Sequence, residues 1–200
     1  MSSTNNKQTP SPATVSTDDL RDVRQSIRGD SESYKRLIER YQQHVSRIMW
    51  RFARDKRTHQ ELVQDVFVEA YLSLSTYKAK APFSHWLAKI ATSVGYQYWK
   101  QSRHRQKTEH FSFEQWDRLA DENKMESIEP DKAGELLHQL LAQLPPRDRL
   151  VLTLRYLEQC DLEETARRTG WSKTMVKVQS HRAKNKLKQL FLAAGQEIEL

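Results

Sequence analysis

The chain of 200 residues is 37% hydrophobic, which allows one modest core or two small ones, and its formal net charge of +7 favours a polyanionic partner. It contains no apolar run long enough to span a bilayer and no apolar signal-peptide core near its first residue, so we expect a cytoplasmic protein without direct membrane insertion. Its five glycines form no phosphate-binding loop and its seven histidines form no pair at metal-ligand spacing, so we expect no cofactor, no metal site and no catalytic residues.

The N-terminal half has the pattern of an extension followed by a helical domain. Residues 1–17 are rich in Ser, Thr, Asn and Pro, which is typical of a disordered segment. From residue 18 onward, apolar side chains recur at steps of three and four, with a break near Gly29. The same spacing resumes at about Thr58, is interrupted by Pro82, and continues to about Lys100. No stretch alternates as a strand does, so we predict one all-helical domain over residues 18–107.

The helix expected from about Thr58 has two different faces. Leu62, Val66 and Tyr71 can face the core of the domain. This leaves an outer face that is polar and acidic, made of Glu61, Gln64, Asp65 and Glu69. A solvated charged face is one interpretation of this pattern, and an interaction surface for a basic partner is the other.

A basic and aromatic stretch begins within the last part of the next expected helix and extends beyond it. Between residues 95 and 108, four Lys or Arg residues and no acidic ones are interleaved with three aromatic residues. Cationic groups can hold the backbone of single-stranded nucleic acid while rings stack on unpaired bases, at about 1–3 kcal/mol per base. For Trp86 and Tyr98 we favour burial in the core. Burial is a poor explanation for Lys100, Arg103 and Arg105, which lie beyond the apolar pattern.

An acidic segment separates this domain from a second one. Residues 109–131 hold eight acidic residues against two basic ones, which predicts a flexible or lightly structured linker over residues 108–131. We predict a second helical domain over residues 132–194, in which Pro145 and Pro146 separate two helices. Its Cys160 is the single cysteine of the chain, so it forms no internal disulfide, and we expect it to be a small buried apolar residue.

The end of this second domain has the pattern of a helix-turn-helix. Asp161 is suited to cap a short helix whose first turn is acidic, and Gly170 supplies the left-handed stop. Ser172 caps the next helix, which carries six Lys or Arg residues and no acidic residue as far as Lys188.

This second helix separates basic from apolar side chains. At about 100° per residue, one stripe about 80° wide holds Lys173, Lys177, His181, Lys184 and Lys188. A separate face holds Val176, Ala183, Leu187 and Leu190. A solvated basic helix is the plain interpretation, but the capped helix and glycine turn before it favour a DNA-binding helix.

Both halves together resemble a bacterial RNA polymerase sigma factor of the extracytoplasmic-function group. The likeness runs from about residue 18 to 190 and is carried by residues 61–71, 83–91, 144–151, and 176–177 with 181–184. It implies an all-α fold with two small domains, a bundle like sigma region 2 and a helix-turn-helix like sigma region 4. It also implies an alternative sigma factor, not an enzyme, that binds core RNA polymerase, recognises the −35 and −10 promoter elements and opens the DNA.

The resemblance also implies roles for individual residues. Docking on the clamp helices of the largest polymerase subunit falls to Glu61, Gln64, Asp65, Phe67 and Glu69. Capture and melting of the −10 element falls to Lys78, Lys80, Phe83, Ser93, Tyr96, Gln97, Lys100 and Arg103. Recognition of the −35 element falls to Ser172, Lys173, Thr174, Lys177, Gln179, Ser180, His181, Arg182 and Lys184.

The partners implied are core RNA polymerase, at its clamp helices and flap region, promoter DNA, and an anti-sigma factor that is often membrane-anchored. The acidic linker corresponds to the connector that threads toward the RNA exit path.

Two single positions and one triplet depart from the family pattern. Ser93 stands where an Asn is frequent, and Thr165 where a larger aliphatic residue is common. In the second helix, residues 178–180 are Val-Gln-Ser in place of the usual small-Arg-Leu triplet. We therefore expect promoter choice to differ from that of relatives at this triplet.

Two other classes of function compete with this interpretation. A helix-turn-helix regulator that acts without polymerase would share the C-terminal pattern, but it leaves the acidic face and the basic-aromatic stretch without a role. An enzyme acting on nucleic acid would need a metal or nucleophile site, and the sequence has no sign of one.

Overall fold

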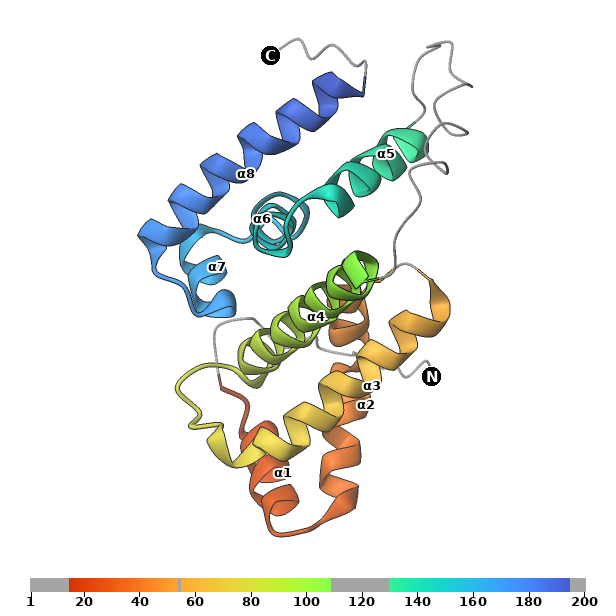
Figure 1. Ribbon diagram of the computed structural model, residues 1–200. Helices are drawn as coiled ribbons and strands as arrows, with labels where there is room; N and C mark the ends of the chain where they lie inside the picture. Colours follow the sequence, from red (N-terminus) through yellow and green to blue (C-terminus); the bar gives the residue numbers. More distant parts are fainter. Residues whose placement is uncertain (1–14, 54, 109–129, 195–200) are drawn as a thin grey trace, which may run out of the picture. The chain divides into compact units, whose positions relative to one another are not determined.

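The computed structural model describes residues 15–53, 55–108 and 130–194, and the regular structure in these ranges is entirely helical (Figure 1). This confirms the all-α prediction. The helices are α1 (Thr17–Ile27), α2 (Ser31–Met49), α3 (Lys56–Ser73), the 3₁₀ turn η1 (Leu74–Thr76), α4 (Phe83–Thr108), α5 (Pro130–Gln143), α6 (Pro146–Leu152), the π-helical turn η3 (Thr153–Leu157), α7 (Leu162–Thr169) and α8 (Lys173–Ala193).

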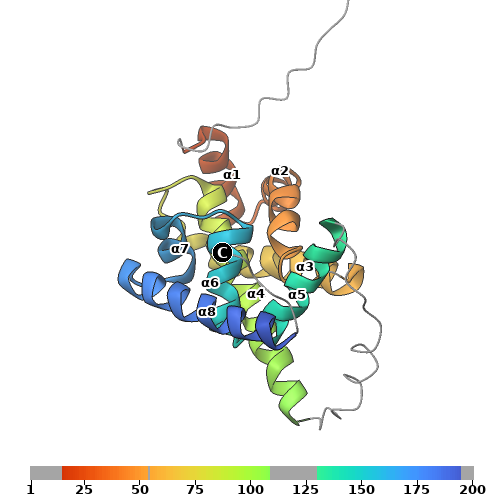
Figure 2. The ribbon, with the colours of Figure 1, turned by 90° about the horizontal axis from the view of Figure 1, so that it is seen from above.

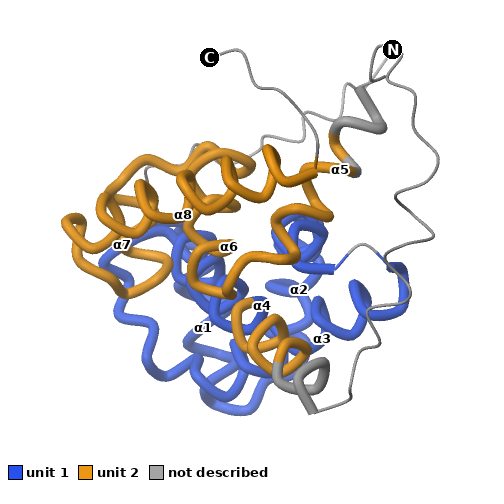
Figure 3. The backbone as a smooth tube through the Cα atoms, turned by 45° about the horizontal axis from the view of Figure 1, so that its top comes forward, with its two compact units in different colours: residues 1–95 blue, residues 96–200 orange. Residues whose placement is uncertain are grey.

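The chain forms two compact units, residues 1–95 and 96–200, and the division falls within α4 (Figure 3). The domain boundaries expected from the sequence, 18–107 and 132–194, stay predictions. The expected disordered extension and the expected acidic linker fall almost wholly on residues 1–14 and 109–129, which lie outside the described residues.

Side-chain caps begin the first three helices. The Asp30 carboxylate accepts a hydrogen bond from the backbone N–H of Glu32 at the start of α2, and Asp55 accepts one from Thr58 at the start of α3. Such a cap stabilises a helix by about 1 kcal/mol relative to alanine. Between α1 and α2, Gly29 has a φ of 96°, in the left-handed region that favours glycine. The break predicted near Gly29 is therefore confirmed.

The core of the first unit lies between α2, α3 and the start of α4. Its largest buried side chains include Leu37, Val45, Met49, Val66, Phe83 and Leu87. Tyr71 was expected to face this core, but it is 49% exposed and packs edge-on against Tyr34. That expectation was wrong because Tyr71 follows Leu62 by nine positions, about two and a half turns, and so lies on the opposite side of α3.

A buried polar network joins α1 to α2. Asp22 is fully buried on α1 and accepts hydrogen bonds from Arg36 and Arg40 of α2, with N–O distances of 2.9 Å to each guanidinium. The Tyr41 hydroxyl donates to Asp19 at 2.6 Å. Burial raises the pKa of Asp22, but the hydrogen bonds and charges of the two arginines outweigh it and leave this pKa below its usual value.

The second unit contains the helix-turn-helix of α7 and α8, in which α8 packs against α6 and α7 packs against α8 (Figures 1 and 2). Asp161 accepts from the N–H of Glu164 at 2.7 Å, Gly170 has a φ of 74°, and Ser172 accepts from the N–H of Met175 at 3.1 Å. These three features confirm the predicted caps and turn. Buried Leu141, Leu144, Val151, Leu152, Val176 and Ala183 form the core.

Two smaller expectations for this unit are also confirmed. Helix α5 ends at Gln143 and α6 begins at Pro146, so the two prolines separate the helices as predicted. Cys160 is buried, and this burial raises the pKa of its thiol.

Candidate nucleic-acid and protein interfaces

Helix α8 presents the two faces that its sequence predicts. Val176 and Ala183 are fully buried, and Leu187 and Leu190 pack against the same core. The basic stripe defined by Lys173, Lys177, His181, Lys184 and Lys188 is exposed along its whole length. Because the cations lie on a surface and the apolar residues hold the helix in place, α8 can meet a polyanion without losing its packing.

Two cations of this stripe have partners within the second unit. The Lys173 ammonium lies 2.9 Å from a carboxylate oxygen of Glu163, and the Lys184 ammonium lies 4.8 Å from the ring centre of Tyr156. Both members of the Lys173 pair are exposed, so the pair contributes little to stability and can be exchanged for a phosphate. Tyr156 had no predicted role, since it stands outside the helix-turn-helix pattern.

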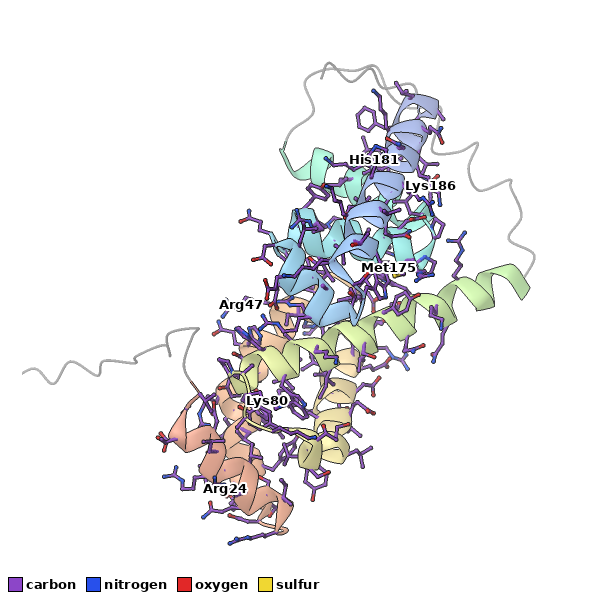
Figure 4. All side chains as sticks on the ribbon, turned by 90° about the vertical axis from the view of Figure 1, so that its left-hand side faces the viewer. Arg24, Arg47, Lys80, Met175, His181 and Lys186 are labelled. Carbon is purple, nitrogen blue, oxygen red and sulfur yellow. The ribbon has the colours of Figure 1, made fainter. Side chains whose placement is uncertain are left out.

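A buried carboxylate on α6 holds the opposite side of α8. Asp148 is 1% exposed and accepts hydrogen bonds from the side-chain amide of Gln179 and from the ammonium of Lys186, the latter at 2.6 Å. Figure 4 labels Lys186 and His181, which both project from α8. The contact was missed in the sequence because it joins positions more than 30 residues apart.

The three residues at positions 178–180 differ in whether their side chains are occupied inside the domain or exposed. Gln179 is occupied by Asp148, and Ser180 is 8% exposed and donates a hydrogen bond to the Val176 carbonyl. Both were predicted to recognise the −35 element, yet both face the domain. Val178 is 44% exposed and is the member of the triplet left on the outer face.

The other predicted −35 residues lie where DNA could reach them. Each of these side chains is exposed: Ser172, Lys173, Thr174, Lys177, His181, Arg182 and Lys184.

The residues predicted for the −10 element come from a loop and from one face of α4. Lys78 and Lys80 are exposed on the loop before α4. Figure 4 labels Lys80 on this loop. On α4, Ser93, Gln97 and Lys100 are exposed and share a face about 60° wide. Tyr96 and Arg103 are half-buried at its side, with the Lys100 ammonium 5.7 Å from the Tyr96 ring centre. The side chains of residues 104–108 lie outside the described residues, among them that of Arg105.

An aromatic cluster supports the loop that carries Lys78 and Lys80. The Phe83 ring lies 5.2 Å from those of Tyr77 and Trp86, and 5.3 Å from that of Tyr41. The Tyr77 hydroxyl donates to the Ala81 carbonyl at 2.8 Å and closes the loop.

Phe83 is buried within this cluster. The side chain is 1% exposed, so a contact between DNA and its ring would require the ring to leave the core. Trp86 and Tyr98, for which we favoured burial, are both half-buried.

The acidic face of α3 is exposed as predicted, at Glu61, Gln64, Asp65 and Glu69. Phe67 was grouped with them, but it is 8% exposed and packs in the core beneath. Next to this face, a groove of about 560 Å³ lies between α2 and α3. Its walls include Ile38, Val63, Val68, Tyr71 and Leu72.

The sequence analysis did not predict this groove. It could have been inferred from Val68 and Leu72, two apolar residues one turn apart on α3 that do not belong to its buried face and are 52% and 71% exposed.

Comparison with known proteins identifies the family to which this chain belongs. Residues 37–105 match the family model described as Sigma-70 region 2, and residues 134–187 match the one described as Sigma-70, region 4. The chain is similar to RNA polymerase sigma factor YlaC of Bacillus subtilis, at 26% identity over 83% of this chain and 96% of that protein. It is also similar to the ECF RNA polymerase sigma-E factor of Escherichia coli, at 25% identity over 70% of this chain and 76% of that protein. The chain belongs to the extracytoplasmic-function sigma factors.

Solved structures support the sigma factor fold. CnrH in complex with the cytosolic domain of CnrY matches with a TM-score of 0.54 and 21% identity, over 88% of this chain and 99% of that one. The sigma factor RpoE of Bartonella quintana, in complex with the anti-sigma factor NepR, matches with a TM-score of 0.52 and 18% identity, over 80% of this chain and 97% of that one.

Each candidate surface of this sigma factor falls inside one of the two matched regions. Region 2 contains the acidic face of α3, the loop with Lys78 and Lys80, and the exposed face of α4. Region 4 contains Asp148 and α8 as far as Leu187. Across the described ranges, none of the helices has the length and apolar content needed to cross a membrane.

Proposed function

We propose that this sigma factor binds core RNA polymerase through α3, recognises the −35 element with α8, and captures the −10 element with the loop before α4 and the exposed face of that helix. One observation carries the proposal: the acidic surface and the basic surface lie on different helices, each inside a different matched sigma region. Acids lie on α3 in region 2, and cations lie on α8 in region 4. A function in DNA binding alone would leave the acidic surface without a binding role.

The surface of α3 suits a helical partner that is basic on one side and apolar on the other. Glu61, Asp65 and Glu69 supply the charges, and the neighbouring groove supplies apolar surface at Val68 and Leu72. The clamp helices of the largest polymerase subunit are the partner implied by the family. Electrostatic steering of this kind raises the association rate, and the apolar groove contributes to lifetime.

Charge reversal on α3 tests this assignment. The full chain with Asp65→Arg should bind core polymerase at least tenfold more weakly in a fluorescence titration, because the new charge meets basic groups of the partner. Glu32→Arg is the matched control, since Glu32 is an exposed acid of the same unit outside the groove. Unchanged affinity of Asp65→Arg for core enzyme would contradict the assignment of this face.

Opening of the −10 element is assigned to trapping of unpaired bases. Lys78 and Lys80 can hold the backbone from the loop, while Tyr96 and Lys100 offer a ring and a cation on α4. No nucleotide hydrolysis is required, since the free energy comes from binding the displaced bases.

A premelted promoter tests this step. Tyr96→Ala with Lys100→Ala should lower open-complex formation by holoenzyme on duplex DNA, measured by permanganate reactivity of thymines in the −10 element. On a promoter with a mismatched −10 bubble, activity should return toward that of the unaltered chain. A defect of equal size on both templates would show that these residues act elsewhere.

Control by an anti-sigma factor is the last part of the proposal. CnrH and RpoE, whose folds this chain shares, were solved in complex with CnrY and with an anti-sigma factor. We infer that a comparable partner covers the region 2 surfaces of this chain when transcription is not required. Purification of the tagged chain from uninduced cells should recover that partner, and recovery of the chain with core polymerase alone would contradict the inference.

A further inference from the structure

An apolar side chain stands in the middle of the outer face of α8. Val178 is 44% exposed, whereas Val176 and Ala183 on the same helix are fully buried. At about 100° per residue, Val178 lies about 160° around the helix from Val176 and about 140° from Ala183. It is therefore directed away from the core of its own unit.

Most of the side chains around Val178 are polar and exposed. Thr174 precedes it by one turn, and His181 and Arg182 follow it by one turn. The exception is Met175, three positions earlier, which is half-buried. Val178 is thus an exposed apolar residue inside the surface that the proposed function places against DNA.

The rotation of α8 is set on its other side. Gln179 and Lys186 both donate to the buried carboxylate of Asp148, and the Ser180 hydroxyl donates within the helix. Gln179 and Lys186 cannot turn toward DNA without giving up their hydrogen bonds to the buried Asp148 carboxylate. Ser180 would likewise give up its bond within the helix. Of residues 178–180, Val178 is the one available for contact.

The DNA major groove offers one apolar group at base edges, the C5 methyl of thymine. Cytosine, guanine and adenine present hydrogen-bonding groups that a valine cannot satisfy. We propose that Val178 is a specificity-determining residue that selects a thymine in the −35 element by packing against this methyl group. The inference rests on the proposed function, since it requires α8 to enter the major groove.

The experiment begins by defining the −35 sequence. Holoenzyme selects from a promoter library in which the −35 hexamer is randomised, and the selected sequence must contain a thymine on one strand. Each thymine is then replaced in turn by deoxyuridine, which removes the C5 methyl group and leaves hydrogen bonding unchanged. At one position, this replacement should weaken holoenzyme binding about fourfold, the effect expected for one buried methyl group.

A double-mutant cycle assigns that methyl group to Val178. In Val178→Ala holoenzyme, the deoxyuridine replacement at the same position should have no effect on binding. Lys188→Ala is the matched control, because it also removes an exposed side chain of α8 yet should keep the full fourfold sensitivity. Alanine favours helix at this exposed position, and circular dichroism verifies that α8 is retained.

The outcomes separate the inference from the function on which it rests. Equal deoxyuridine sensitivity in the unaltered and Val178→Ala proteins would overturn the inference and leave −35 recognition by α8 intact. A selected −35 sequence without thymine on either strand would overturn it as well. No enrichment of any −35 sequence would overturn the proposed role of α8 itself.

Discussion

Asp148 and Lys186 form an ion pair between α6 and α8, with 2.6 Å between the Lys186 ammonium nitrogen and a carboxylate oxygen. The carboxylate is almost fully buried, while the Lys186 side chain is half exposed. The second carboxylate oxygen is occupied by Gln179. One acid on a short helix thereby fixes two positions on the helix that we propose to contact DNA.

Removal of either partner of the Asp148–Lys186 pair should destabilise the protein. Asp148→Ala leaves the half-buried Gln179 amide without its acceptor and should lower the free energy of unfolding by about 1–3 kcal/mol, measured by urea denaturation. Lys186→Ala leaves the buried Asp148 carboxylate without its cation and should also cost about 1–3 kcal/mol, although the lysine itself is half exposed. Losses no larger than those of a surface ion pair, about 0–1 kcal/mol, would contradict the view that Asp148 holds α8.

The network between α1 and α2 predicts a dependence of stability on acid. The pKa of Asp22 is lowered in the folded protein, so its contribution to stability is present above its unfolded-state pKa of about 4. That contribution is lost as the pH falls through the folded-state pKa. Asp22→Asn should be less stable at neutral pH and should lose less stability between pH 5 and pH 3, as followed by thermal unfolding at each pH. A parallel pH profile for the two proteins would exclude Asp22 as a source of acid sensitivity.

Gly95 on α4 lies against the ring of Phe52, where a Cβ atom would overlap the ring carbons. Gly95→Ala should therefore destabilise the protein by about 1–3 kcal/mol, despite the better helix propensity of alanine. Gly134→Ala is the matched control, because a Cβ there meets nothing within 4 Å. On α5, the same substitution should stabilise by up to about 1 kcal/mol. Differential scanning calorimetry of both variants distinguishes packing from propensity.

Salt dependence should separate phosphate contacts from base contacts on α8. Lys188 lies at the end of the basic stripe, where we expect a phosphate contact, so Lys188→Ala should reduce the slope of log affinity against log salt by about 0.9. Val178→Ala should leave that slope unchanged, because valine releases no counterion. The measurement is the affinity of holoenzyme for a −35 duplex between about 50 and 200 mM salt, a range over which phosphate contacts make the affinity fall steeply. An unchanged slope for Lys188→Ala would exclude Lys188 from phosphate contact.

Most of the helices could be predicted because their signals are local. Asp161, Gly170 and Ser172 each act within four residues of themselves, so the caps and turn of the helix-turn-helix follow from short spacing alone. The exposed stripe of α8 and the exposed acids of α3 also follow from helical periodicity.

The remaining features depend on contacts between distant segments. The sequence placed Tyr71 in the core, but rotation about the helix axis puts it on the opposite side of α3. Contact of Gln179 and Ser180 with DNA stays a prediction, and the structure pairs Gln179 with Asp148 and buries Ser180. The groove beside α3 exists because α2 leaves Val68 and Leu72 uncovered. Composition and periodicity determined an all-helical protein with one basic and one acidic surface. Only tertiary structure decided which side chains of those surfaces are free to bind, because a polar group already paired inside the protein is costly to release.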